Sequence, residues 1–268
     1  MSAEIPLDGG NTNAGVVRVG DTVRRAPRPN ARALRALLEH LDARAPGIAP
    51  RHLGTDERGR EVLSWIEGWS GVDPALWREE APLVGAARLL RRLHDACADF
   101  DTSAWEWPMR RTGDADGVES TDDTVLCHHD AAPYNMVFRD GAPVALIDFD
   151  LAGPGPALHD VAYTLYWFAP LAFAAEDMRP FAERELAAGL PRTRLFCETY
   201  GIGRDAALVD AVAERLRELA DVALMRRLFG EAVAARLVDE GHVAHWARES
   251  RAFEARRDRL VRAFGETP

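Results

Sequence analysis

The first quarter of the chain alternates short β-prone runs with turn residues. Valine-rich runs at 16–19 and 22–25 are separated by Gly20-Asp21, an arrangement that predicts a β-hairpin. Further strands are expected at 51–55 and 61–66, on either side of a polar turn at 56–59. Between the hairpin and these strands, alanines and leucines recur at helical spacing and predict a helix over 31–41.

The remainder of the chain predicts mainly helices. One is expected over 83–93, and the aperiodic polar stretch 102–123 is expected to be a surface loop. Short strands at 135–138 and 143–147, joined by Asp140-Gly141, predict a second hairpin. Beyond Leu158 the apolar spacing is helical throughout. The helices predicted there span 158–174, 178–188, 192–200, 205–229 and 231–263.

This order of elements predicts an α+β protein with two lobes. Residues 1–67 would form a small, β-rich N-terminal lobe, and residues 68–268 a larger, mainly helical C-terminal lobe. A chain of 268 residues is long enough to bury a core in each. A cleft between two such lobes is a natural ligand site.

Charge and composition narrow the classes of partner. The net charge of −10 disfavours nucleic acid, which requires a basic surface, and it can attract cationic small molecules. No apolar run approaches the ~20 residues of a membrane helix, and the N-terminus lacks the pattern of a signal peptide. We therefore expect a cytoplasmic protein without a membrane partner, as a monomer or dimer.

Cysteine and lysine usage is unusual. The three cysteines, Cys97, Cys127 and Cys197, are odd in number and show no metal-ligand spacing, so we expect them to be small buried residues. The sequence contains no lysine, and all 33 basic residues are arginines. Any contact with phosphate by a basic side chain must therefore come from arginine.

The stretch 124–163 contains the strongest chemical pattern. It contains His128-x-Asp130-x4-Asn135, then the second hairpin, then Ile147-Asp148-Phe149-Asp150. Phosphoryl transfer needs one carboxylate to accept the proton of the attacking hydroxyl, and oxygen ligands to hold Mg²⁺ against the nucleotide phosphates. Asp130 suits the first role, and Asn135 and Asp148 suit the second. The opposing interpretation is an ordinary hairpin with Asn and Asp at its turns.

This ordered set resembles the phosphotransferase family of aminoglycoside, choline and related small-molecule kinases. The resemblance implies a bilobal protein-kinase-like fold, ATP or GTP as co-substrate, Mg²⁺, and a small-molecule hydroxyl acceptor, for which an aminoglycoside-like or other cationic metabolite is one class. It implies Asp130 as the catalytic base and Asn135 and Asp148 as Mg²⁺ ligands. It also implies that Asp160 braces the catalytic loop and that His128 is structural.

The same resemblance assigns nucleotide contacts to the N-terminal lobe. Gly9, Gly10 and Asn11 would form the loop over the phosphates, Val23 would lie under the adenine, and the Ser64 carbonyl and Ile66 N–H would bond the adenine edge. The Gly9-Gly10-Asn11 segment could equally be an ordinary turn. The segment 64–66 could be an ordinary strand end, with Trp65 and Ile66 in the core.

The strand 22–25 departs from the family pattern. Arg25 stands where the family carries a phosphate-binding lysine, and alternation puts it on the same strand face as Val23 and opposite Arg24. The helical glutamate that would pair with the lysine is missing, because no Glu lies at 31–35 and Glu39 is a turn too late.

Other functions remain open at this point. His94-Asp95, His128-His129 and Asp148 could be arranged as a metal phosphohydrolase, although that architecture is all helical. A zinc site from His128, His129 and Asp130 is opposed by extended backbone, in which neighbouring side chains point apart.

Two further readings keep the kinase-like fold. One is a non-catalytic nucleotide- or partner-binding protein with an immunity or regulatory role, and the other is a kinase for a peptide Ser or Thr. For a small-molecule acceptor, an acidic pocket for amino groups could be formed by Glu176, Asp177, Glu183, Glu185 and Glu198. These residues could equally be solvated helix faces.

Overall fold

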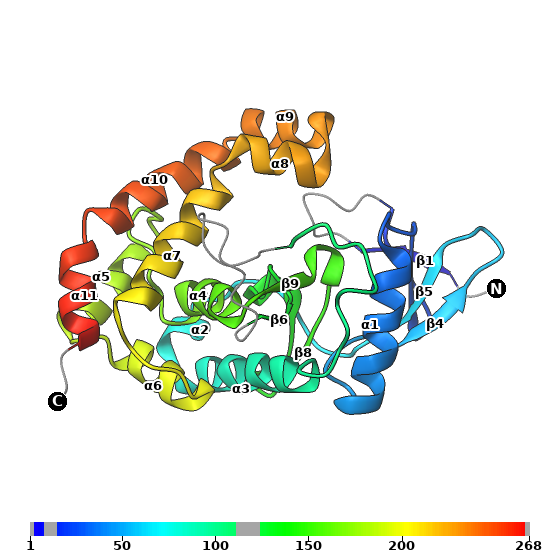
Figure 1. The fold of residues 1–268 in the computed structure, drawn as a ribbon, viewed down its shortest axis with the longest axis horizontal. Coiled ribbons are helices and arrows are strands. Elements are labelled where there is room, and N and C mark those ends of the chain that lie inside the picture. Colours follow the sequence, from blue (N-terminus) through cyan, green and yellow to red (C-terminus); the bar gives the residue numbers. More distant parts are fainter. Residues whose placement is uncertain (1–2, 8–14, 111–123, 266–268) are drawn as a thin grey trace.

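The N-terminal lobe is an antiparallel sheet with one helix (Figure 1). The computed structural model describes residues 3–7, 15–110 and 124–265. The sheet has five strands in the order β1-β2-β3-β5-β4. Its strands are β1 Glu4–Pro6, β2 Val17–Val19, β3 Thr22–Arg25, β4 His52–Thr55 and β5 Glu61–Ser64. Helix α1 (Ala31–Arg44) buries its leucines in the same apolar core as Leu63 of β5.

The C-terminal lobe is mainly helical and contains two small β-ribbons. Helices α3 (Glu80–Ala96) and α4 (Ala157–Phe168) pack against each other in its centre. Strand β6 (Thr124–Cys127) pairs with β9 (Gly153–Pro156), and β7 (Met136–Arg139) pairs with β8 (Ala142–Leu146). Two 3-10 turns, 133–135 and 149–151, flank the β7–β8 ribbon. The other helices are α2 Ala75–Arg78, α5 Arg179–Ala187, α6 Pro191–Tyr200, α7 Ala206–Leu219, α8 Val222–Phe229, α9 Glu231–Asp239, α10 His242–Glu254 and α11 Arg257–Gly265.

The predicted class and architecture are confirmed, as are the two hairpins and the first helix. The long C-terminal helices are shorter than predicted. The predicted helix 158–174 ends at Phe168, because Pro170 has no backbone N–H with which to continue the helical hydrogen bonds. Beyond it, the backbone N–H groups of Phe173, Ala174 and Ala175 donate to the buried carboxylate of Glu249.

The predicted helices 205–229 and 231–263 are also each interrupted. The first breaks at Asp221, whose side chain accepts from Ala223 N–H and so begins α8. The second breaks at Gly241, in the left-handed region with φ of 80°, and again after Glu254.

Strand β9 is formed by a sequence that does not favour strands. Its residues, Gly-Pro-Gly-Pro, lack β propensity, and no strand was expected there. Pairing with β6 imposes the extended conformation. Gly153 is required at its start, because a side-chain Cβ there would lie 1.8 Å from the Met109 carbonyl oxygen.

A linker between β5 and α2 joins the lobes, and the predicted boundary at 67/68 falls in it. Trp69 and Phe138 of β7 exchange backbone hydrogen bonds of 3.2 and 2.7 Å, and their rings stack with centroids 4.5 Å apart. Gly71 N–H donates to the Pro133 carbonyl over 3.3 Å. The linker therefore lies along the segment that carries Asn135.

Burial explains the cysteines. Cys97, Cys127 and Cys197 are buried and form no disulfide, as predicted. Burial raises the pKa of both Cys97 and Cys197 to about 12, so neither thiol is reactive near neutral pH. Within the described ranges, none of the helices combines the length and the apolar character needed to cross a bilayer.

Gly68 is expected to be essential to the joint between the lobes. A Cβ at Gly68 would lie 2.5 Å from the Phe138 carbonyl oxygen and 2.6 Å from a Val137 methyl carbon. Gly71 has a similar φ, 140° against 143°, but open space around it. Gly68→Ala should therefore cost about 1–3 kcal/mol more unfolding free energy than Gly71→Ala, measured by urea denaturation. Equal losses would show that backbone strain alone matters and that the close approach to β7 does not.

Candidate active site

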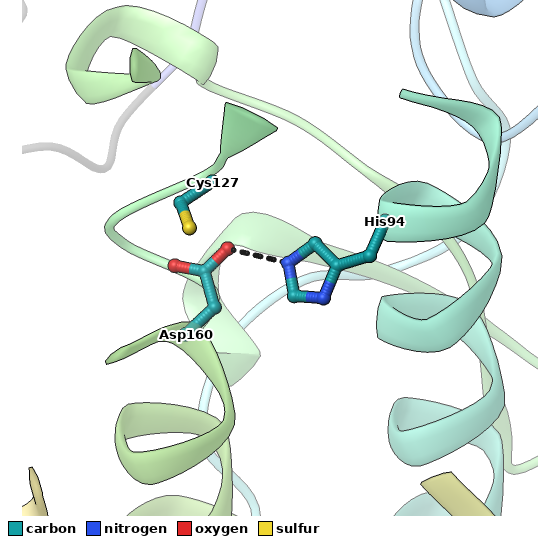
Figure 2. Close-up of side chains that lie close together, drawn as sticks. All are labelled: His94, Cys127 and Asp160. Carbon is teal, nitrogen blue, oxygen red and sulfur yellow. Dashed lines mark hydrogen bonds and ion pairs between the residues drawn. The ribbon is translucent and has the colours of Figure 1, made fainter. Parts of the chain in front are cut away.

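Asp160 holds the segment between β6 and β7 by accepting hydrogen bonds from its backbone. Asp160 lies in the first turn of α4, and its two carboxylate oxygens accept the consecutive backbone N–H groups of His128 and His129 at 2.6 and 2.7 Å. His94 of α3 donates to the same carboxylate over 3.2 Å (Figure 2). These contacts lower the pKa of Asp160 despite complete burial. Asp160 is thus a structural anion, in agreement with the sequence-based expectation.

His128 fixes the other side of the same segment. Its Nε2–H donates to the Ile147 carbonyl over 2.9 Å, so Nδ1 is the acceptor and receives the Asp130 backbone N–H at 3.3 Å. Burial lowers the pKa of His128 and keeps the ring neutral. The imidazole thereby links Ile147, the residue before Asp148, to Asp130.

Two clusters around Asp160 have the composition of metal sites but are occupied by hydrogen bonds. Figure 2 shows His94, Cys127 and Asp160 converging. Cys127 Sγ lies 3.5 and 3.4 Å from the carbonyls of Gly155 and Pro156, and carbonyl oxygens beside a thiol oppose the thiolate that a metal needs. His94 Nδ1 is 2.6 Å from the Tyr200 hydroxyl. These three side chains therefore connect α3, β6 and α4.

The second cluster links the catalytic segment to α7. His159 Nε2–H donates to Glu218 over 2.9 Å, so its Nδ1 accepts from His129 Nδ1–H at 3.1 Å. Arg215 donates to the His129 carbonyl over 2.7 Å and lies 3.4 Å from Glu218. His129 itself has a φ of 61°, a strained conformation for a non-glycine residue. Helix α7 therefore helps to hold this turn.

Asp130 is half-buried and surrounded by donors. Its Oδ1 accepts from the Tyr134 hydroxyl at 2.9 Å, and its Oδ2 accepts from Asn135 Nδ2 at 2.8 Å. Desolvation raises the pKa of Asp130, and the positive charge of Arg215 opposes that shift. A carboxylate of raised pKa is a better proton acceptor than one in water.

Asn135 and Asp148 offer a donor set that suits Mg²⁺. The Asn135 amide nitrogen is engaged by Asp130, which leaves the amide oxygen as the coordinating group. Asp148 is in the left-handed conformation (φ of 61°) at the end of β8. Burial and the nearby Asp150 carboxylate raise the pKa of Asp148 to about 7. Crowded carboxylates with an amide oxygen are hard ligands, and a divalent cation would relieve their repulsion.

Arg25 connects the N-terminal lobe to these carboxylates. Its Nη1 lies 2.6 Å from Asp150 and 3.8 Å from Asp148, and its Nε donates to Glu61 over 3.0 Å. Arg25 is only 8% exposed. Nearby Asp150, Glu61 and Asp148 raise the pKa of Arg25 against the opposing effect of burial.

No glutamate of α1 pairs with Arg25, as expected, but Arg25 has a glutamate partner that the sequence analysis did not identify. The antiparallel register of β3 and β5 places Glu61 directly opposite Arg25. The pairing carboxylate thus comes from the neighbouring strand and not from the helix. Glu39 of α1 pairs with exposed Arg35 instead.

The structure describes some of the other residues predicted to contact the nucleotide, but not all of them. Val23 is half-buried in β3 opposite Leu63. Ser64 donates its N–H to the Arg51 carbonyl and accepts the Arg51 N–H at Oγ, both at 2.9 Å, and neither bond uses its carbonyl. Among the described residues, the Ile66 N–H donates to no backbone carbonyl. Gly9, Gly10 and Asn11 lie outside the described residues.

Trp65 is not a core residue. It is half-buried, with the Arg18 guanidinium carbon 4.1 Å from its ring centroid, and its Nε1–H donates to Glu67 over 2.8 Å. The tryptophan therefore covers the outer side of the linker.

Sequence reasoning missed several residues of this site. They are Arg28, whose Nε lies 2.5 Å from Asp150, together with Glu61, Tyr134, Asp150 and Arg215. The second acidic position of Asp148-Phe149-Asp150 was a usable signal for Asp150. Arg215 offered none, because it lies 85 positions beyond Asp130 in chain numbering and meets the loop only through tertiary packing.

A hollow of about 560 Å³ lies elsewhere, along α1 and α3, and shares no residue with this site. Arg44, Arg88, Arg91 and Arg92 line it, and ion pairs with Asp99 and Asp95 occupy two of these arginines. It is an open and largely self-paired surface.

Removing the Asp160 charge should destabilise the protein. Asp160→Asn retains size but replaces one acceptor oxygen by a donor, and we expect a loss of about 3 kcal/mol in unfolding free energy at pH 7. Because folding lowers the pKa of Asp160, its contribution is present above the unfolded value of about 4 and declines as the pH falls further.

Urea denaturation at several pH values measures this effect. The gap between parent and Asp160→Asn should narrow below about pH 4. Asp95→Asn, an exposed aspartate of α3 paired with Arg91, is the control and should change stability by less than about 0.5 kcal/mol. A gap independent of pH would contradict the role of the Asp160 charge.

Comparisons with known proteins identify relatives in sequence and in fold. The chain is 39% identical over 215 residues to the trifolitoxin immunity protein of Rhizobium leguminosarum bv. trifolii, covering 76% of each chain. Among solved structures, a spectinomycin phosphotransferase in complex with ADP and spectinomycin has a TM-score of 0.62 at 13% identity, covering 94% of this chain and 93% of that one.

Another solved structure shares the fold. A choline/ethanolamine kinase family protein from Mesorhizobium loti has a TM-score of 0.55 at 18% identity, covering 93% of this chain and 88% of that one. Residues 103–196, which include the Asp130, Asn135, Asp148 and Asp160 positions, match the sequence model of the phosphotransferase enzyme family. The chain therefore belongs to the phosphotransferase enzyme family.

Proposed function

We propose that this protein transfers the γ-phosphoryl group of ATP or GTP to a hydroxyl of a small molecule, with Asp130 as the base. The observation that carries the proposal is the direct hydrogen bond, 2.8 Å, between the Asp130 carboxylate and the Asn135 amide. A proton acceptor and a metal-binding group are thereby fixed side by side. Family membership and nucleotide-bound relatives of the same fold support it.

In this mechanism Asp130 orients the acceptor hydroxyl and takes its proton while the acceptor oxygen bonds to the γ-phosphorus. The bond between that phosphorus and the nucleoside diphosphate breaks. Bound Mg²⁺, held by Asn135 and Asp148, would supply positive charge against the phosphate oxygens. Arg25 and Arg28 hold Asp150 beside this position, and we assign to Arg25 the phosphate contact that the family gives to lysine.

A second candidate is protection of the host without catalysis. The relative at 39% identity is named an immunity protein, and a kinase-like protein could confer immunity by binding alone. Phosphorylation of a toxic small molecule would also confer it. The two cases differ in their dependence on Asp130.

Asp130→Asn should separate these candidates. An amide accepts a proton poorly, so ADP release with acceptor should fall by about 10²–10⁴-fold, whereas nucleotide affinity should change little. Calorimetric titration with Mg·ATP and a coupled ADP assay measure the two quantities. Turnover at the parental rate would remove Asp130 from the base role. A parent that binds Mg·ATP and releases no ADP with any acceptor would favour the non-catalytic candidate.

Arg25→Ala should weaken Mg·ATP binding by about one to two powers of ten, the range of a buried charge-assisted hydrogen bond of ~1.5–3 kcal/mol. Arg25→Lys should retain part of the affinity, because a single ammonium cannot contact Glu61 and Asp150 as the guanidinium does. The control is Arg24→Ala, on the opposite strand face near Asp56. Equal effects at positions 24 and 25 in calorimetry would show that neither contacts phosphate.

A further inference from the structure

The surface next to the proton-accepting oxygen of Asp130 is aromatic. The Tyr134 hydroxyl donates to Asp130 Oδ1 and receives the Tyr163 hydroxyl at 2.8 Å. Tyr134 is 38% exposed. Its ring meets the half-buried Trp167 edge-on, with centroids 5.8 Å apart and an interplanar angle of 89°. A hydroxyl bound at Asp130 Oδ1 would therefore lie next to the Tyr134 ring, with the Trp167 ring beside it.

Buried aromatic rings hold the Tyr134 and Trp167 rings in place. Trp246 of α10, 5% exposed, has its ring centroid 6.4 Å from that of Trp167 and 6.3 Å from that of Tyr163. Tyr166 lies edge-on to Trp167, with centroids 5.6 Å apart. The Trp167 carbonyl is held by the Trp77 indole N–H at 2.9 Å. The aromatic surface is thus preformed, and a ligand need not order it.

Arg215 is a buried cation beside this aromatic surface. The Arg215 guanidinium carbon lies 4.5 Å from the centroid of Tyr163, and the side chain is almost completely buried. Its charge opposes the effect of burial on Asp130. The guanidinium also lies 3.4 Å from Glu218, so this side of the surface carries a cation that is already paired and supplies no net negative charge to bind a cationic group of the acceptor.

Two of the five carboxylates considered for an acidic pocket, Glu183 and Glu185, are engaged in contacts between helices. Glu183 pairs with Arg256, and Glu185 accepts the Thr193 backbone N–H at 3.0 Å. Glu218 binds His159 and Arg215. These contacts hold helices to one another, and for Glu183 and Glu185 they argue against the acidic pocket considered from the sequence.

We propose that the acceptor is a neutral or anionic small molecule with an aromatic or flat apolar ring beside its hydroxyl, packed on Tyr134 and Trp167. This inference rests on the proposed phosphotransferase function. The hydroxyl shares Asp130 Oδ1 with the Tyr134 hydroxyl, since each carboxylate oxygen can accept two hydrogen bonds. The ring sits on the aromatic surface, where the Arg215–Glu218 pair offers no net negative charge to a cationic group.

Two matched sets of alcohols test this class by ligand-observed NMR with Mg²⁺ and a non-hydrolysable ATP analogue. One set carries a ring and consists of phenyl β-glucoside and 2-(4-hydroxyphenyl)ethanol. The other set carries an ammonium group and consists of methyl 2-amino-2-deoxyglucoside and an aliphatic amino alcohol of the same length as 2-(4-hydroxyphenyl)ethanol. The ring set should bind at least about fivefold more tightly, the effect of one aromatic pair of ~1 kcal/mol.

Variants of the full chain locate the binding. Trp167→Ala and Tyr134→Ala should each weaken the ring set by about fivefold. Trp105→Ala, a half-buried tryptophan outside the cluster, should not. Circular dichroism confirms folding of each variant, and Trp167→Phe replaces Trp167→Ala if the latter unfolds.

Three results would overturn the inference: equal or tighter binding of the amino alcohols, ring binding insensitive to Tyr134 and Trp167, or no binding of either set. Calorimetry with Mg·ATP on the parent separates the two levels of failure. A parent that binds no nucleotide overturns the proposed function. A parent that binds nucleotide and fails the NMR test overturns only the acceptor class.

Discussion

The site depends on one buried carboxylate that accepts two consecutive backbone N–H groups. Asp160 fixes His128 and His129 at the start of the segment that ends in Asn135. Asp130 and Asn135 are then set by local bonds within that segment. A charged acceptor is needed here because two buried N–H groups point at one place, and a neutral side chain could not satisfy both equally well. The neutral His128 and the His94 contact complete this frame.

Charges at the boundary between the lobes form a second, linked system. Asp148 and Asp150 come from the C-terminal lobe, whereas Arg25, Arg28 and Glu61 come from the N-terminal lobe. The arginines reduce the repulsion between the two aspartates but leave the pKa of Asp148 raised to about 7. The same arginines are suited to phosphate oxygens. The lobes are therefore joined by the charges that we propose to handle Mg²⁺ and nucleotide.

The helical lobe contributes more than a scaffold. Arg215 reaches from α7 to the His129 carbonyl, and α4 and α10 supply the rings around Tyr134. Aromatic rings and the Arg215–Glu218 pair thus lie beside Asp130, whereas a binding site for a polyamine would present free carboxylates. We propose the role of the base from family membership, and we infer the class of acceptor from this region. Relatives of one fold can therefore act on different hydroxyls.

The sequence alone determined the elements that depend on local patterns: the two hairpins, the helix over 31–41, and the ordered motif that contains Asp130, Asn135, Asp148 and Asp160. These follow from periodicity, turn residues and a fixed spacing within 40 positions. Only the tertiary structure decided that Glu61 pairs with Arg25, that Arg215 supports the loop, and that Glu249 accepts the backbone N–H groups of the segment after α4. Each of these contacts joins positions 36 to 86 apart. Sheet register and helix packing create them, and neither leaves a local signal in the chain.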